Sequence, residues 1–337
     1  MVGRDSVEPK SNSHKIRARE TLVPPFKKLT MKIIHAANEL KPAGRKVCLA
    51  IGFFDGVHLG HQQIIRQTIT DARQHDAIAL VLTFDRHPNA VVAPARLPPL
   101  IYPLSQKLNV IESLGTDVSL LIHFDEKFSR QTGEEFIRGL ARDLGKIQSL
   151  CVGKDFVFGR QRSGDVTLLE KLGAETSFTV HGLAAVSLDG RTVSSTRIRE
   201  AIRAGELDAA SQMLGRPYAI SGAVVKGDQV GRQLGFPTAN LEVAGLILPP
   251  NGVYAGLTRV KKKSYRVALN IGFRPTVAAA VRQLRVEAHL LDFSGNLYGE
   301  ELTIGLGAKL REEKKFASSA ELERQISRDI ATLRASA

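Results

Sequence analysis

The sequence contains no tryptophan, only two cysteines and no apolar run long enough to cross a bilayer. A membrane-spanning helix needs about 20 consecutive apolar residues, so we expect none here. The first residues also lack the apolar core of a secretory signal. Cys48 and Cys151 each lie inside an apolar run typical of a buried strand. We therefore expect free, buried thiols in a reducing compartment and a cytoplasmic protein.

The charge is unbalanced: the formal net charge is +13. Such an excess is typical of proteins that bind nucleic acid, but also of enzymes whose substrates are polyphosphates. Part of the excess is peripheral, because residues 1–30 carry seven Lys or Arg against three acids. With no tryptophan and no RNA-recognition motif, the polyphosphate alternative is the simpler one. A basic nucleic-acid-binding protein with a translation-factor-like barrel remains the alternative from another class.

Residues 1–30 are polar and aperiodic and include Pro24-Pro25, so we expect disorder there. They are either a tail or residues upstream of a true start at Met31. Three acidic residues speak against a transit peptide.

From Met31 to Leu214 the pattern alternates strands with helices. The predicted strands are Val47–Phe53, Ala77–Phe84, Val118–Phe124, Ser149–Val152 and Phe178–Val186, and the predicted helices are Gln62–Gln74, Leu104–Leu114, Gly133–Leu144 and Thr167–Leu172. Alternation of this kind indicates an α/β domain with a mostly parallel sheet, which binds its ligands at the carboxyl ends of the strands.

After Leu214 short strand-like runs separated by turn residues predominate. They are Ala219–Val225, Val253–Val260, Ser264–Ile271, Arg285–Phe293 and Leu302–Leu306. This pattern predicts a small antiparallel β barrel or sandwich. Ser318–Leu333, with Glu321 three residues after Ser318, predicts a C-terminal amphipathic helix. We therefore divide the chain into a disordered extension (1–30), an α/β domain (31–214) and a β domain (215–337).

The most specific motif is Gly52-Phe-Phe-Asp-Gly-Val-His-Leu-Gly-His61, between the first long strand and its helix. A helix start offers unpaired backbone N–H groups and the positive end of the dipole, so it binds anions readily. Gly60 removes a side chain where a phosphate would approach. His58 and His61 can add hydrogen-bond donors to a developing charge; otherwise they are two surface histidines at a helix start.

A second motif, Val193-Ser-Ser-Thr-Arg-Ile-Arg199, brings capping hydroxyls and backbone N–H groups to another helix start. Arg199 lies one turn further on, where a guanidinium can grip phosphate by two parallel bonds. On its own this is equally an ordinary helix cap with surface arginines. Asp155 and Phe156, after the fourth strand, and His87, after the second, are either ligand contacts or ordinary loop and core residues.

In the second domain the densest motif is Gly227-Asp-Gln-Val-Gly-Arg-Gln-Leu-Gly-Phe-Pro-Thr-Ala-Asn240. Its glycines allow close approach of the backbone to a ligand. Thr238 and Asn240 alternate on an extended segment, so their oxygens could ligate one hard cation. Arg285, Glu287 and His289 share one face of a strand, where Glu287 is either a general base or part of a solvated polar face.

Together the motifs carry a resemblance. The HxGH and SSTxxR pair resembles the nucleotidylyltransferase superfamily. The GRxLGFPTAN run, Pro249-x-Gly-Val-Tyr254, Asn270-Ile-Gly-x-Arg-Pro-Thr276 and Val286-Glu-Ala-His-Leu-Leu-Asp-Phe293 resemble riboflavin kinase. From Met31 to its end the chain is similar to bacterial bifunctional riboflavin kinase/FAD synthetases. This implies a Rossmann-like domain that adenylylates FMN, followed by a β-barrel kinase domain with a C-terminal helix.

The resemblance also implies roles for individual residues. Glu287 would take the proton of the ribityl hydroxyl, and Thr238 and Asn240 would hold Mg²⁺ and phosphates under the loop formed by Gly227, Gly231, Arg232 and Gly235, with Pro237 stiffening its exit. His58, His61 and Arg199 would serve adenylyl transfer. The remaining contacts to ATP or flavin would come from Gly52, Phe54, Asp55, Gly56, Gly60, Asp155, Ser195 and Thr196.

The implied ligands are riboflavin, FMN and ATP with Mg²⁺; we expect no nucleic-acid or membrane partner and at most a weak homo-oligomer. One departure concerns Val277-Ala-Ala-Ala280, where the family often has a glycine-rich mobile loop. Alanines restrict φ, so we expect a less mobile loop and a slower kinase. A second alternative is an enzyme with one activity, whose barrel is kept only to bind flavin or to regulate.

Overall fold

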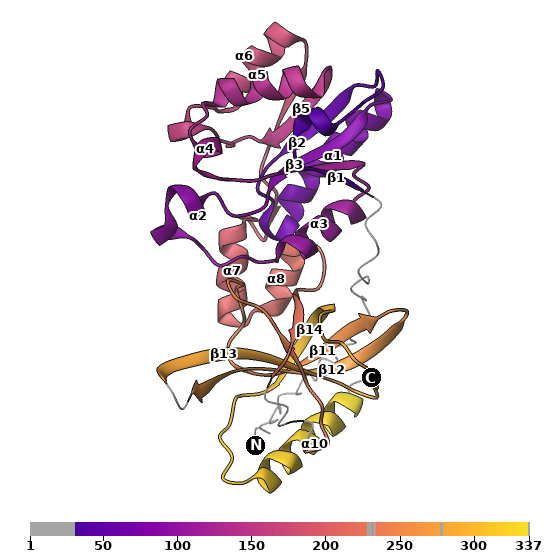
Figure 1. The fold of residues 1–337 in the computed structure, drawn as a ribbon, viewed down its shortest axis with the longest axis vertical. Coiled ribbons are helices and arrows are strands. Elements are labelled where there is room, and N and C mark those ends of the chain that lie inside the picture. Colours follow the sequence, from indigo (N-terminus) through magenta and orange to yellow (C-terminus); the bar gives the residue numbers. More distant parts are fainter. Residues whose placement is uncertain (1–30, 228–230, 232–233, 277–278, 336–337) are drawn as a thin grey trace, which may run out of the picture.

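The computed structural model describes residues 31–227, 231, 234–276 and 279–335. Three expectations lie outside the described residues and stay predictions. They are the disorder of residues 1–30, the role of Arg232 and the restricted loop that begins at Val277. Figure 1 shows two parts joined by a pair of helices: a parallel sheet covered by helices, and a barrel with one terminal helix.

The first part is built on a six-stranded sheet in the order β1-β4-β3-β2-β5-β6, in which every neighbouring pair is parallel. The strands are β1 (Lys32–Ile34), β2 (Val47–Ile51), β3 (Ile78–Phe84), β4 (Val118–Ile122), β5 (Ile147–Gly153) and β6 (Thr179–Leu183). From β2 the chain continues to β3 on one side, and β5 lies on the other side. The topological switch point of the sheet is therefore between β2 and β5. The predicted α/β class is thus confirmed.

Alternate residues of the strands are buried against opposite layers of helices. Helices α1 (Leu59–Gln74) and α3 (Leu104–Ser113) share a core with Cys48 and Ala50. Helices α5 (Gly133–Leu144) and α6 (Val166–Thr176) share the other core with Val47 and Leu49. Period-two burial on both faces explains why these strands read as continuous apolar runs. Both cysteines are free and buried, as expected.

Several short elements had no clear signal in the sequence. They are β1, the β7–β8 hairpin (Ser187–Leu188 and Arg191–Thr192), the one-turn helices α2 (Asn89–Val92) and α4 (Glu126–Ser129), and four 3-10 turns (Ala37–Glu39, Asp55–Val57, Pro94–Arg96 and Arg160–Arg162). Elements of two to four residues are too short to show a hydrophobic period.

The second part is a closed antiparallel barrel, which decides between the barrel and the sandwich. Its strands run in the order β10-β13-β12-β11-β14-β9. They are β9 (Ala219–Val225), β10 (Ala239–Leu241), β11 (Gly252–Val260), β12 (Lys263–Thr276), β13 (Ala279–Leu290) and β14 (Glu301–Arg311), followed by α10 (Ser319–Ala335). None of the helices in the described residues has the length and apolarity needed to cross a membrane.

Helices α7 (Ser195–Ala204) and α8 (Leu207–Leu214) lie between the sheet and the barrel (Figure 1). Their buried residues belong to the same apolar core as the barrel interior. A strap, Pro99–Tyr102, adds a backbone connection: Leu100 N donates to Gly245 O at 2.8 Å, and Ile247 N donates to Leu100 O at 2.8 Å. The two parts are therefore packed together rather than merely tethered.

Helix α10 is attached to the barrel by a nearly buried ion pair. Arg311 Nε on β14 donates to both carboxylate oxygens of Asp329, at 3.0 and 2.9 Å, and the two side chains are only 15% and 8% exposed.

Removal of one partner of the Arg311–Asp329 pair leaves the other charge buried and unpaired. We expect Asp329→Ala to lower the free energy of unfolding by about 3 kcal/mol, measured by urea denaturation. Glu323→Ala, at an exposed position of the same helix, is the control, and equal losses in both variants would show that the pair contributes nothing specific.

Candidate functional site

A cavity of about 370 Å³ opens at the switch point of the sheet. It is lined by the turn after β2, by Gly153–Phe156 after β5, by residues after β6 and by the start of α7. Loops after adjacent parallel strands meet at the same sheet edge, which is where α/β folds bind ligands. The cavity thus joins the two motifs that the sequence places 140 residues apart, since Ser195 Oγ donates to Asp55 O at 3.1 Å.

The turn after β2 has an unusual backbone. Phe54, Gly56 and Val57 have φ values of 56°, 74° and 42°. Positive φ is common for glycine but strained for the β-branched Val57. Such a conformation persists only where its surroundings hold it. Here Val57 O accepts hydrogen bonds from Gln62 Nε2 at 2.9 Å and from Arg216 at 3.0 Å.

The turn delivers two stacked imidazoles to the cavity. The rings of His58 and His61 lie 3.6 Å apart with an interplanar angle of 21°. Both Nδ1 atoms are buried and make no hydrogen bond within the described residues. Burial, followed by the nearby Arg216 and Arg199, lowers the pKa of His58 to about 4. Burial, together with the neighbouring His58, Lys107 and Arg216, holds the pKa of His61 well below 6.5. Both rings are therefore neutral at pH 7.

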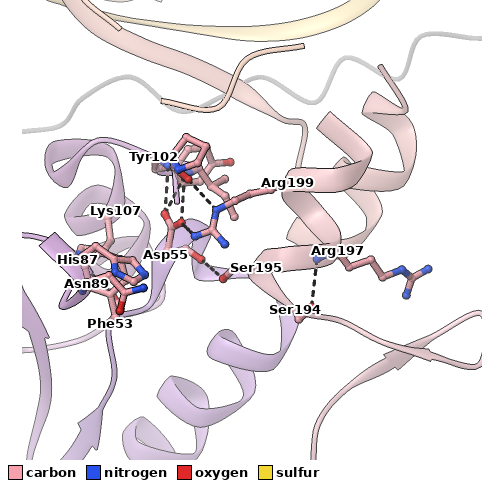
Figure 2. Close-up of polar contacts among 12 residues, drawn as sticks. Phe53, Asp55, His87, Asn89, Tyr102, Lys107, Ser194, Ser195, Arg197 and Arg199 are labelled. Atoms are coloured by element: carbon pink, nitrogen blue, oxygen red, sulfur yellow. Dashed lines mark hydrogen bonds and ion pairs between the residues drawn. The ribbon is translucent and has the colours of Figure 1, made fainter. Parts of the chain in front are cut away.

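Asp55 and Arg199 form a buried ion pair beside the histidines. Arg199 Nη2 donates to Asp55 Oδ2 at 2.6 Å, and Arg199 Nε donates to Pro99 O at 2.7 Å (Figure 2). The Asp55 carboxylate also accepts from Ile101 N at 3.0 and 3.1 Å. Burial raises the pKa of Asp55, while the Arg199 charge opposes this. Two of the three guanidinium nitrogens are thus engaged, and Nη1 makes no hydrogen bond within the described residues.

Most of the residues predicted for this site line the cavity. They are Gly52, Phe54, Asp55, His58, Gly60, His61, Asp155, Ser195 and Arg199, together with His87 and Phe156. Gly56 and Thr196 do not line it, and Thr196 is exposed on α7. Asp55 is present, but its carboxylate is occupied by Arg199 and the strap. The ligand contact expected of Asp55 stays a prediction.

Three residues that support the site carry no motif. Gln62 and Arg216 hold the backbone of the turn, and Lys107, on α3, joins the ends of β2 and β3. Lys107 Nζ donates to Phe53 O at 3.2 Å, Thr83 Oγ1 at 3.2 Å and Phe84 O at 2.8 Å, and it lies 4.4 Å from the Phe53 ring centroid. Burial lowers its pKa to about 7. For Lys107, the only signal in the sequence is a lysine within a helical pattern. That signal does not identify the groups that the lysine contacts.

The residues predicted for the second site gather on one edge of the barrel. Asn240 on β10 is paired with Val225 on one side and with Glu287 of β13 on the other, and Glu287 is also paired with Asn270 of β12. Arg285, Glu287 and His289 alternate with the buried Val286, Ala288 and Leu290, so they share one face of the strand, as predicted, and it is the outer face of the barrel. His289 Nδ1 lies 2.9 Å from Pro237 O, which fixes the segment before Thr238.

Of the glycine segment (residues 227–235), Gly227 and Gly231 lie close to the side chains of Asn240 and Thr238. A Cβ on Gly227 would lie 2.6 Å from Asn240 Cγ, and one on Gly231 would lie 3.3 Å from Thr238 Oγ1. The atom nearest to a Cβ on Gly231 would be Phe236 O, at 2.5 Å, so a side chain at Gly231 would meet backbone, whereas one at Gly227 would meet the Asn240 amide. A cavity of about 380 Å³ is lined here by Gly227, Asn240, Gly245, Leu246 and Arg285, among others. Thr238, Gly231, Gly235, Pro237 and Glu287 do not line it.

Two family models match the chain. One, described as FAD synthetase, matches residues 40–197, and the other, described as riboflavin kinase, matches residues 214–337. Three relatives are each named bifunctional riboflavin kinase/FMN adenylyltransferase. The chain is 38% identical over 306 residues to that of Escherichia coli K12, covering 90% of this chain and 97% of the relative. It is 37% identical over 305 residues to that of Pseudomonas fluorescens (90% and 97%) and 35% identical over 304 residues to that of Bacillus subtilis 168 (89% and 95%).

A solved structure resembles the whole chain. It is a crystal structure from Streptococcus pneumoniae described as a macrolide-efflux protein, with a TM-score of 0.76, 26% sequence identity, and coverage of 90% of this chain and 99% of that chain. The similarity extends over both the parallel sheet and the barrel.

The buried neutral histidines predict a pH dependence of stability. The unfolded chain takes up a proton on His58 near pH 6.5, whereas the folded chain does so only near pH 4. The free energy of unfolding should therefore be fully retained above pH 6.5 and fall as the pH drops toward 4. We expect His58→Gln to make this fall shallower, measured by urea denaturation between pH 7 and pH 4.5. His75→Gln, at an exposed position, is the control, and an unchanged slope in the His58 variant would contradict the prediction.

Proposed function

The chain belongs to the family of bifunctional riboflavin kinases/FMN adenylyltransferases, and from this we propose which residues carry each of its two reactions. The enzyme phosphorylates riboflavin to FMN with ATP, and it transfers the adenylyl group of ATP to FMN, forming FAD and pyrophosphate. We assign the first reaction to the barrel edge at Glu287 and the second to the cavity at the switch point of the sheet.

The assignment of adenylyl transfer rests on one observation: His58, His61, Ser195 and Arg199 converge on a single cavity. In the reaction, a phosphate oxygen of FMN forms a bond to the α-phosphorus of ATP while the bond from that phosphorus to the bridging oxygen breaks, and pyrophosphate leaves. Negative charge accumulates on phosphate oxygens throughout. Catalysis here therefore requires alignment and donors of positive character.

The two imidazoles are suited to this task because they are buried and neutral in the free protein. A polyphosphate beside them favours protonation and raises their pKa. Each ring can then donate to phosphate oxygens with an added positive charge. Arg199 and Ser195 line the same cavity, and N–H groups at the start of α7 would complete an anion site. Asp55 holds Arg199 and does not contact phosphate.

The flavin of FMN needs an apolar, planar surface. Phe156 lines the cavity and stacks on Phe158, with ring centroids 5.2 Å apart and an interplanar angle of 15°. A series of aromatic contacts continues from there through Phe136, Phe128, Phe124 and Phe84. We place the isoalloxazine ring beside this series, with Asp155 at the rim.

For the kinase, Glu287 is the proposed general base. It lies on β13, where it is paired with Asn240 of β10. Its carboxylate would accept the proton of the ribityl hydroxyl as that oxygen attacks the γ-phosphorus of ATP, and ADP leaves. The glycine segment would cover the phosphates, since only backbone atoms fit above Asn240.

The donor set at this edge fits a magnesium ion bound with ATP. Thr238 Oγ1 and Asn240 Oδ1 are hard oxygen donors, and two protein ligands suffice when phosphates supply others. Magnesium bound there would neutralise charge on the transferred phosphate. At the first site, we propose that Mg²⁺ is carried on the phosphates of ATP. The absence of nucleic-acid and membrane partners, weak self-association and a cytoplasmic location stay predictions.

The two sites should be separable by single substitutions. Glu287→Gln removes the base and should slow FMN formation by about 10²–10⁴-fold, while adenylylation of supplied FMN continues. His61→Ala should leave riboflavin phosphorylation intact, so that FMN accumulates. The measurement is a time course with purified protein, riboflavin, ATP and Mg²⁺, in which the flavins are separated and quantified.

Wild type is expected to form FMN before FAD. If wild type made FAD only from supplied FMN, the barrel would be a binding or regulatory module without kinase activity. If Glu287→Gln formed FMN at the wild-type rate, the assigned base would be wrong.

A further inference from the structure

Arg216 lies outside both catalytic motifs. It follows α8 and precedes β9, the first strand of the barrel. It lies near the start of the riboflavin kinase match, which begins at residue 214, and beyond the FAD synthetase match, which ends at residue 197. Its position in the chain therefore assigns it to the kinase match. Its side chain, however, contacts the turn after β2 in the other half of the molecule.

The guanidinium of Arg216 holds the strained turn that precedes His58. Arg216 Nη1 donates to Val57 O at 3.0 Å and to Leu214 O at 2.9 Å, and Nη2 donates to Gly56 O. The guanidinium also lies 5.2 Å from the centroid of the Tyr102 ring. The planar fork thus reaches two successive carbonyls of the turn at once, which a lysine ammonium cannot reproduce.

Gln62 completes a clamp around the same groups. Its Nε2 donates to Val57 O at 2.9 Å and to Leu214 O at 2.7 Å. Two side chains, one on α1 and one before the barrel, therefore bind the same pair of carbonyls. Because Val57 has a φ of 42°, the turn would relax toward ordinary backbone angles if these bonds were removed. Such a change would move His58, the next residue.

We propose that Arg216 is a positioning residue for FMN adenylylation, acting through the backbone of Gly56 and Val57 to place His58. This deepens the proposed function, since it takes the cavity at the switch point to be the adenylylation site. It also makes the first residues of the kinase match part of the other activity.

The charge of Arg216 has a second effect. It is the largest electrostatic contribution, after burial, to the low pKa of His58. The other charged or titratable groups facing this ring are His61 on α1, Asp55 in the turn and Arg199 on α7, and Lys107 on α3 faces His61. Removal of Arg216 should therefore raise the His58 pKa, whereas a lysine should largely preserve it.

The experiment compares Arg216→Met and Arg216→Lys in the full chain, with Arg203→Met as control because Arg203 is exposed on α7. Adenylylation of supplied FMN and phosphorylation of riboflavin are measured on each protein. We expect kcat/KM for adenylylation to fall about ten- to a hundred-fold in both Arg216 variants, with phosphorylation within about two-fold of wild type. NMR titration of His58 should show a raised pKa in the Met variant alone.

Each outcome is decisive. Equal losses in both activities would make Arg216 a structural residue and overturn the proposal, as would adenylylation equal to that of the control. A raised His58 pKa without loss of adenylylation would also overturn it. If the Met variant does not fold, the Lys variant, which keeps the charge, decides by the same comparison of the two activities. Failure of the proposed function itself is distinguishable, since wild type would then form no FAD from FMN and ATP.

Discussion

The site depends on a strained turn, Phe54–Val57, whose carbonyl groups are bound by side chains from distant parts of the chain. Three positive φ values within four residues are costly. The cost is offset by hydrogen bonds to Gly56 O and Val57 O and by the pairing of Asp55 with Arg199. In return, the turn brings His58 and His61 into a stacked arrangement at the start of α1. Without these supports the motif would be an ordinary glycine-containing loop.

The same supports connect the two parts of the molecule. In the strap, Pro99 O accepts from Arg199, Leu100 pairs with Leu246, and Ile101 N donates to Asp55. Gly245 and Leu246, which the strap contacts, also line the cavity at the barrel edge. The Asp55–Arg199 ion pair and the wall of the cavity on the barrel are thus joined through three consecutive residues. The strap and the shared apolar core together hold the two parts of the molecule against each other.

The two proposed sites are built differently. In the cavity at the switch point, burial and neighbouring cations keep both imidazoles neutral. A bound anion raises the pKa of such groups, so they become positively charged only when the anion lies beside them. On the barrel, Glu287 and Asn240 are adjacent across two strands of the outer face, and Gly227 lies against the Asn240 side chain.

The sequence alone determined the fold class of both halves, the long elements and most of the residues that line the cavity at the switch point. Hydrophobic periods are local properties, and the motifs are short and specific, so both can be read without coordinates. It also indicated that Glu287 and His289 share one face of a strand, because alternation along a strand is local too. The boundaries expected near residue 214 rest on the same change of pattern and stay predictions.

Only the tertiary structure decided how the motif residues are held. Nothing local indicates that Asp55 binds Arg199, that Lys107 ties two strand ends, or that Gln62 and Arg216 share the carbonyls of Val57 and Leu214. These contacts join residues separated by up to 159 positions. They depend on helix packing and on the placement of the barrel, which set the distances between side chains and distant carbonyls. A spacing in sequence specifies none of those distances, and so the supporting residues appear only in the fold.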